Sequence, residues 1–139
     1  MRVFLDANIL FSAAKSAGAV REFLSRLEAA GHALCADAYV VEEARRNLAV
    51  KGPEALAALG QLLARLEIGA FRIDPLPAPV TVRVHEKDWP VVAAAVRLGC
   101  DVLLTGDRTH FGSLFGHRST PIVRANLFFG FFSHDSSLP

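Results

Sequence analysis

Hydrophobic and polar residues alternate along the chain in blocks that predict short buried strands and amphipathic helices in turn. Apolar runs that end at Gly, Pro, Asn or Asp are typical of strands, and apolar residues at helical spacing are typical of helices. The expected strands cover residues 2–5, 32–36, 70–74, 101–105 and 121–123. The expected helices cover residues 19–30, 37–50, 53–66, 89–98 and 125–132. Asp37 is the expected N-cap of the second helix, and Gly31 and Gly99 are expected to end the helices that precede them.

This alternation predicts an α/β fold, a three-layer α/β/α sandwich around a mainly parallel sheet of four to five strands. The chain has 139 residues, of which 52% are hydrophobic, and this fits a single domain over residues 1–139 whose last few residues form a flexible tail. Parallel sheets of this kind place their functional sites beyond the carboxyl ends of the strands. Asp6 and Asp107 both follow expected strands, so both are expected at that edge.

Charge and composition narrow the classes of function only slightly. The formal net charge is +1, so no general positive field attracts nucleic acid, and binding would need a local patch or metal ions. Cys35 and Cys100 lie in apolar runs without CxxC spacing, which favours buried core residues in a reducing compartment. The apolar opening resembles a secretory signal, but Asp6 and Asn8 interrupt it, and no run approaches the ~20 apolar residues of a membrane span. We therefore expect a cytoplasmic protein without a membrane segment.

Four acidic residues form the candidate site: Asp6, Glu43, Asp88 and Asp107. Each has an ordinary interpretation, because Asp6 and Asp107 could be turn residues, Asp88 an N-cap and Glu43 a solvated helix residue. Their positions favour a shared site. Asp88 lies at the start of an Ala- and Val-rich helix, and Asp6 and Asp107 converge with it if the first and fourth strands are neighbours.

A helical wheel distinguishes the two adjacent glutamates of the second expected helix. Glu43 lies roughly 110° from the centre of the apolar stripe and Glu42 about 150° from it. Glu43 is therefore expected to border the core and Glu42 to face solvent. Asn47 follows Glu43 by one helical turn and is a candidate supporting or substrate contact.

Packed carboxylates repel one another, so a site built from four of them predicts a bound cation. The candidate ligands are all oxygens, and thiolates or paired imidazoles are absent from the set. This donor chemistry favours Mg²⁺ or Mn²⁺ over zinc. Such ions can activate water for attack on a phosphodiester, which predicts nuclease or phosphatase chemistry.

The same residues carry a resemblance to the PIN domain family. The segments that resemble the acidic motifs and closing helix of that family are VFLDANIL, VVEEARRNL, KDWPVVAAAVRLGCDVLLTGDRTHFG and PIVRANLFFGFF. The resemblance covers nearly the whole chain, and its most specific part runs from Asp88 to Gly112. It implies a metal-dependent endoribonuclease, often the VapC-like toxin of a toxin-antitoxin pair, with RNA as substrate and an antitoxin protein as partner.

The resemblance also implies roles for individual residues. The catalytic and metal-binding set is Asp6, Glu43, Asp88 and Asp107, supported by Asn8 and Thr105. Arg46, Asn47 and Arg108 are candidate contacts of the substrate. The roles of His110 and Glu86 are left open.

Two other functions compete with the nuclease. The first is a non-catalytic PIN-like module that binds RNA or protein. The second is a phosphatase of the haloacid dehalogenase class, which needs a second Asp two residues after the first, where this chain has Asn8. Dinucleotide and P-loop motifs do not occur. The aromatic segment from Leu127 to Phe132 further predicts a homodimer, because it carries more apolar surface than one small domain readily covers.

Overall fold

Strands and helices alternate along the chain in the computed structural model, which describes residues 1–72, 89–106 and 122–123. The strands are β1 (Arg2–Leu5), β2 (Ala33–Asp37), β3 (Glu67–Gly69), β4 (Val102–Leu104) and β5 (Ile122–Val123). The helices are α1 (Ala7–Lys15), α2 (Ala19–Ala29), α3 (Ala38–Lys51), α4 (Leu56–Leu63) and α6 (Trp89–Arg97), with a short 3-10 helix η1 (Pro53–Ala55). The expected helix over residues 125–132 lies outside the described residues.

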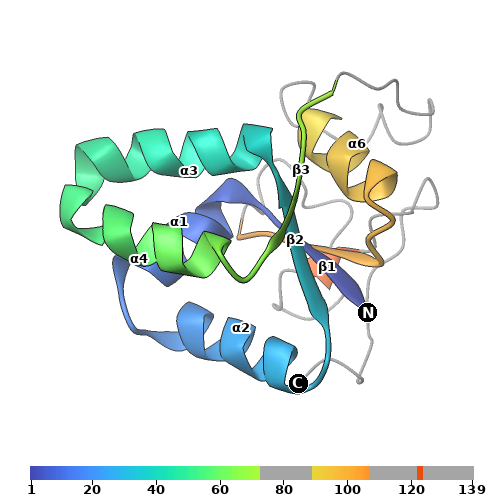
Figure 1. The fold of residues 1–139 in the computed structure, drawn as a ribbon, viewed down its shortest axis with the longest axis horizontal. Helices are drawn as coiled ribbons and strands as arrows, with labels where there is room; N and C mark the ends of the chain where they lie inside the picture. The colour runs from blue at the N-terminus through green and yellow to red at the C-terminus, as the bar shows by residue number, and fades with distance from the viewer. Residues whose placement is uncertain (73–88, 107–121, 124–139) are drawn as a thin grey trace.

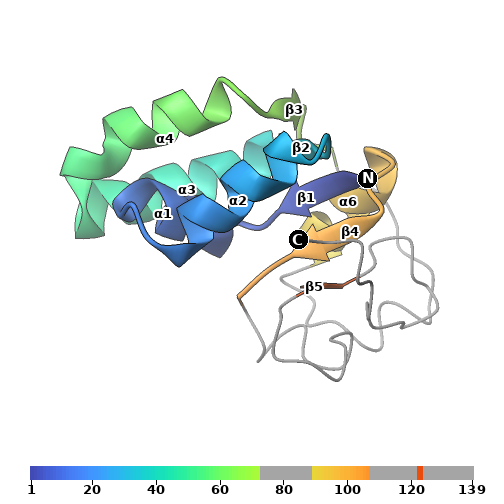
Figure 2. The same cartoon turned by 90° about the horizontal axis from the view of Figure 1, so that it is seen from below.

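The strands form one twisted sheet in the order β3-β2-β1-β4-β5. The pairs β1–β2, β1–β4 and β2–β3 are parallel, and β5 runs antiparallel to β4. Figure 2 shows the strands stacked in this order, from β3 at the top to β5 at the bottom. The expected mainly parallel sheet is confirmed. The first and fourth strands, β1 and β4, are neighbours in it, as the site prediction requires.

Helices cover both faces of this sheet (Figure 1). Helices α1, α2, α3 and α4 lie on one side, and α6 lies on the other, which gives the expected three-layer sandwich. Phe4, Leu5 and Leu103 in the central strands are almost completely buried, because α1 and α3 cover one face and α6 the other. Among the described residues, no helix is both long enough and apolar enough to cross a membrane.

Two local predictions were wrong. Residues Ala7–Lys15 form α1, a helix that is not among the expected elements, because Asp-Ala-Asn after the first strand was expected to be a turn. The third strand is Glu67–Gly69 rather than residues 70–74, because the preceding helix ends at Leu63 and the strand position is set by pairing with β2. Helix ends at glycines were predicted correctly, since Gly31 and Gly99 have φ of 88° and 67°, a conformation that glycine adopts without strain.

Asp37 ends β2 and caps α3, as predicted, but its side chain is almost completely buried. Its Oδ1 accepts a hydrogen bond from the Val40 N–H at 3.2 Å. Among the described residues its Oδ2 has no hydrogen-bond partner. This oxygen lies 3.5 Å from Nη2 of Arg97 on α6, which is an ion pair rather than a well-formed hydrogen bond. Burial raises the pKa of the Asp37 carboxyl, and the Val40 N–H and Arg97 offset only part of this effect.

This raised pKa predicts how stability depends on pH. The folded state binds more protons than the unfolded state between the ordinary Asp pKa of 3.8 and the raised value, so the contribution of Asp37 to stability falls as pH rises through that window. Asn keeps the cap of α3 but does not ionise. We expect the melting temperature of Asp37→Asn, relative to the native chain, to rise with pH across the window. A difference that stays constant or falls would show that the pair with Arg97 outweighs burial.

Candidate active site

The carboxylate of Asp6 lies at the junction of β1 and α1, at the carboxyl edge of the sheet. Asp6 is only 5% exposed, and its Oδ1 accepts a hydrogen bond from the Ala7 N–H at 2.8 Å, which caps α1. Its backbone N–H donates to the carbonyl of Leu104 at 3.0 Å, which continues the pairing of β1 with β4. Asp6 is therefore held in place by two elements, because it directly follows β1 and also caps the start of α1.

Thr105 and Asn8 fix the orientation of this carboxylate. The buried hydroxyl of Thr105 donates to Oδ2 of Asp6 at 2.7 Å, and Nδ2 of Asn8 lies 3.4 Å from the same oxygen. Nδ2 of Asn8 is also 3.4 Å from Oγ1 of Thr105. Both residues were expected to support the site, and the structure brings them into direct contact with Asp6.

Asn8 also holds the chain that leads to Asp107. Its Oδ1 accepts a hydrogen bond from the Gly106 N–H at 2.9 Å, which ties the residue after Thr105 to the start of α1. Asp107 follows Gly106 directly and Asp88 directly precedes α6, and both lie outside the described residues. The same is true of the lesser candidates Glu86, Arg108 and His110.

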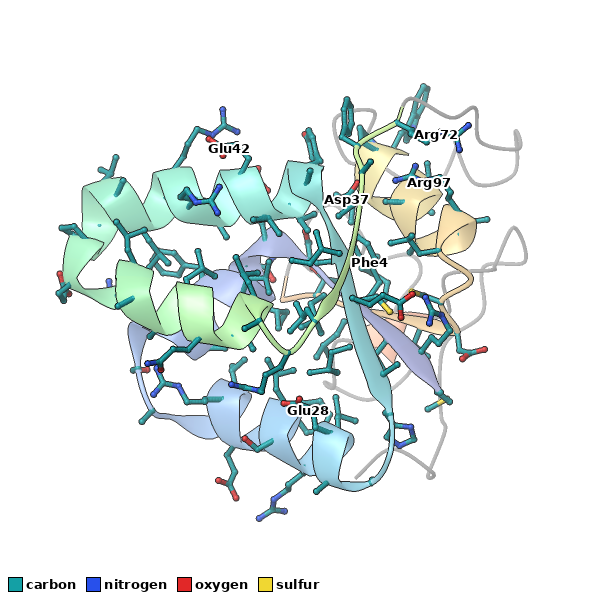
Figure 3. The ribbon with its side chains drawn as sticks, in the orientation of Figure 1. Phe4, Glu28, Asp37, Glu42, Arg72 and Arg97 are labelled. Carbon is teal, nitrogen blue, oxygen red and sulfur yellow. The ribbon has the colours of Figure 1, made fainter. Side chains whose placement is uncertain are left out.

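Glu43 lies one and a half turns into α3, on the helix that packs against α1. It is half-buried, whereas Glu42 is exposed and pairs with Arg45 at 3.2 Å. Figure 3 shows Glu42 on the outer side of α3. The helical wheel therefore distinguished the two glutamates correctly. Arg46 and Asn47 are exposed on the next turn, where they remain accessible to a substrate.

The donors around Asp6 are compatible with a bound cation. The Ala7 amide, the Thr105 hydroxyl and the Asn8 carboxamide are neutral groups, so they orient the carboxylate without cancelling its charge. Carboxylate oxygens held in this way are ligands that Mg²⁺ and Mn²⁺ prefer. In the part of the chain that the structure describes, no group of three His, Cys, Asp or Glu side chains could hold a metal ion, and two of the four expected acids lie outside that part.

Asp37 is a further polar residue of this edge that the sequence interpretation treated only as a helix cap. Register pairs Phe4 with Cys35, so Asp37 occupies on β2 the position that Asp6 occupies after β1. The sequence did contain a signal for this equivalent position, because the apolar runs of β1 and β2 are each followed by an Asp. Its partner Arg97 could not be inferred from the sequence, since Arg97 is on α6, which covers the face of the sheet opposite to α3.

Comparison with known proteins shows the fold. No model of a known protein family matches the sequence, and no curated protein matches it. Among solved structures, the chain is similar to VapBC2 from Rickettsia felis, which was solved bound to a DNA fragment from the VapBC2 promoter. The match has a TM-score of 0.59 and 19% sequence identity, and it covers 81% of this chain and 92% of that chain.

A second solved structure is VapC20 of Mycobacterium tuberculosis, described as a toxin that cleaves the sarcin-ricin loop. It matches with a TM-score of 0.57 and 16% identity over 85% of this chain and 98% of that chain. Both similarities extend over most of each chain while sequence identity is low. The chain therefore has the fold of VapC toxins, which is the PIN-domain fold that its sequence motifs predict.

Proposed function

We propose that the chain is a Mg²⁺- or Mn²⁺-dependent endoribonuclease whose site consists of Asp6, Glu43, Asp88 and Asp107. The observation that supports this most strongly is the Asp6 carboxylate, which is buried at the carboxyl edge and oriented by Thr105 and Asn8. A buried carboxylate requires hydrogen-bond donors in any role, and here they hold both oxygens of Asp6 in one orientation. A fixed orientation of its oxygens is what a ligand of a cation requires.

The proposal divides the residues into those that hold the cation, those that support them and those that contact RNA. A divalent cation held by the acids would activate water and stabilise the leaving oxygen of the phosphodiester. Asp6 holds its charge toward the edge of the sheet, and Thr105 fixes the rotation of its carboxyl group. Asn8 sets the position of Gly106 and thereby the start of the segment that carries Asp107. Arg46, Asn47 and Arg108 are the proposed contacts of the RNA.

The solved structures also support a toxin role. VapC20 is described as a toxin that cleaves the sarcin-ricin loop, and the Rickettsia protein is described as a VapBC pair bound to promoter DNA. We infer by analogy that an antitoxin partner binds this chain and that RNA is its substrate. The cytoplasmic location and the homodimer stay predictions, and the segment from Leu127 to Phe132 that suggests the dimer lies outside the described residues.

Asp6→Asn is expected to reduce metal-dependent cleavage of single-stranded RNA to background. Asn retains the cap of α1 and the size of the side chain, but it removes the charge that holds a cation. The measurement is RNA cleavage with Mn²⁺ and with EDTA, beside a thermal melt. Normal cleavage by this variant at an unchanged melting temperature would contradict the proposed role.

Two adjacent residues provide a matched control for that experiment. Glu43→Gln should lose activity as Asp6→Asn does, because Glu43 is one of the four proposed ligands and is half-buried. Glu42→Gln should stay active, because Glu42 is exposed and faces away. If the native chain binds RNA but leaves the RNA equally intact with Mn²⁺ and with EDTA, the alternative of a non-catalytic RNA-binding module is favoured instead.

Thr105→Val is expected to raise the Mn²⁺ concentration required for half-maximal cleavage by roughly 10- to 100-fold, as losses of such supporting contacts do. Val keeps the branched shape but cannot donate to Asp6, so Oδ2 loses its shortest hydrogen bond while Oδ1 still accepts from the Ala7 N–H. Thr105→Ser keeps the hydroxyl and should retain most of the metal affinity. Equal metal dependence in the Val and Ser variants would mean that the hydroxyl does not position Asp6.

A further inference from the structure

We propose that Tyr39 and Phe71 form a platform on which an unpaired base of the RNA substrate stacks. This inference rests on the proposed ribonuclease function and specifies how the substrate is held. The two rings are stacked, with centroids 5.4 Å apart and an interplanar angle of 23°. Phe71 is 44% exposed, so part of its ring remains accessible beside Tyr39. A flat ring with accessible surface can bind any base, because every base has a π-face.

The platform lies at the same edge of the sheet as Asp6. Tyr39 is in the first turn of α3, directly after β2, and Phe71 is two residues after the end of β3. Because β1, β2 and β3 are parallel neighbours, their carboxyl ends lie at one edge. Adjacent strands are about 4.8 Å apart, so the end of β3 is roughly 10 Å from the end of β1. Phe71 lies two residues, or about 7 Å, beyond that end, so its backbone is roughly 12 Å from Asp6. Stacked nucleotides rise ~3.4 Å each, which places the stacked base within about four nucleotides of the Asp6 site.

Contacts with α6 and with Leu98, directly after it, hold the backbone below the platform in place. Nη2 of Arg97 donates to the carbonyl of Ala70 at 2.9 Å, immediately before Phe71, and the same nitrogen lies 3.5 Å from Asp37. Gly69 packs so closely on Leu98 that a Cβ there would come within 2.7 Å of its Cδ2. Figure 3 shows Asp37, Arg97 and Arg72 gathered where β2 and β3 end beside α6. A preorganised surface loses little entropy on binding, which favours a specific contact.

The residues of this surface fit RNA better than a protein partner. Arg72 follows Phe71 directly in the chain and is exposed, so the surface carries positive charge as well as an aromatic ring. Single-stranded RNA is commonly held by aromatic side chains together with arginine. A protein docking site needs a broad apolar patch. Within the described part, the exposed large hydrophobic residues of β3, of the residues directly after it and of α6 are only Ile68, Phe71 and Val96.

The test measures binding separately from cleavage. In the Asp6→Asn background with EDTA, fluorescence anisotropy would give the Kd for a short fluorescein-labelled single-stranded RNA of mixed sequence. We expect Phe71→Ala and Phe71→Leu to weaken binding roughly tenfold, because both remove the π-face and Leu keeps an apolar side chain. Ile68→Ala, which alters an equally exposed apolar residue on β3, should leave the Kd unchanged. A duplex of the same sequence, which offers no unpaired base, should bind all of these chains equally.

Cleavage kinetics with otherwise native chains separate this inference from the proposed function. Phe71→Leu should raise KM with little change in kcat, because the base is held equally in the ground state and the transition state. If no chain cleaves RNA but binding still depends on Phe71, the ribonuclease proposal fails and the platform stands. If cleavage occurs and both Phe71 variants bind single-stranded RNA as tightly as the parent chain, the platform is wrong. Equal weakening by Ile68→Ala, or no binding to the parent chain, would also overturn it.

Discussion

The hydrogen bonds that join Asp6 to β4 are the interactions on which the candidate site depends. The backbone N–H of Asp6 continues the pairing of β1 with β4, and its carboxylate accepts the hydroxyl of Thr105. A strand end, a helix start and a second strand therefore meet at one carboxyl group. Because parallel pairing places the ends of β1 and β4 at one edge, residues far apart in the chain become neighbours.

A second buried carboxylate plays a different role at the same edge. In the described part of the chain, Oδ2 of Asp37 has no hydrogen-bond partner, and its charge is only partly offset by Arg97 on α6, the helix that covers the face of the sheet opposite to α3. Breaking such a pair leaves a buried charge uncompensated, so both partners constrain how α3 and α6 sit on the sheet. Asp37 also caps the helix that carries Glu43, and Arg97 holds the backbone before Phe71. This pair therefore links the candidate site to the proposed RNA platform.

Local sequence patterns predicted those features that depend only on residues close together in the chain. The strand ending at Leu5, the cap at Asp37 and the exposure difference between Glu42 and Glu43 follow from apolar runs, capping chemistry and helical periodicity. Helix α1 was missed because Asp-Ala-Asn is also typical of a turn, although here Asp6 caps the helix.

The features that sequence patterns could not supply depend on contacts between distant segments. The position of β3 depends on its pairing with β2 and on the close contact of Gly69 with Leu98. The pairs Asp37–Arg97 and Tyr39–Phe71 likewise join residues from separate elements, so no local periodicity marks them. Asn8 and Thr105 were expected only through the resemblance to PIN domains, because the wheel and the strand pattern carry no information about their contact with Asp6.

The central claim is that the Asp6 carboxylate binds a divalent cation at the carboxyl edge of the sheet. Anomalous diffraction from crystals of the full chain soaked in Mn²⁺ tests this most directly, because it locates the ion independently of any activity. We predict an anomalous peak within ~2.6 Å of an Asp6 oxygen, with the remaining ligands from Glu43, Asp88, Asp107 or water. Ordered Asp6 still bonded to Thr105, with no peak near it at saturating Mn²⁺, would contradict the claim.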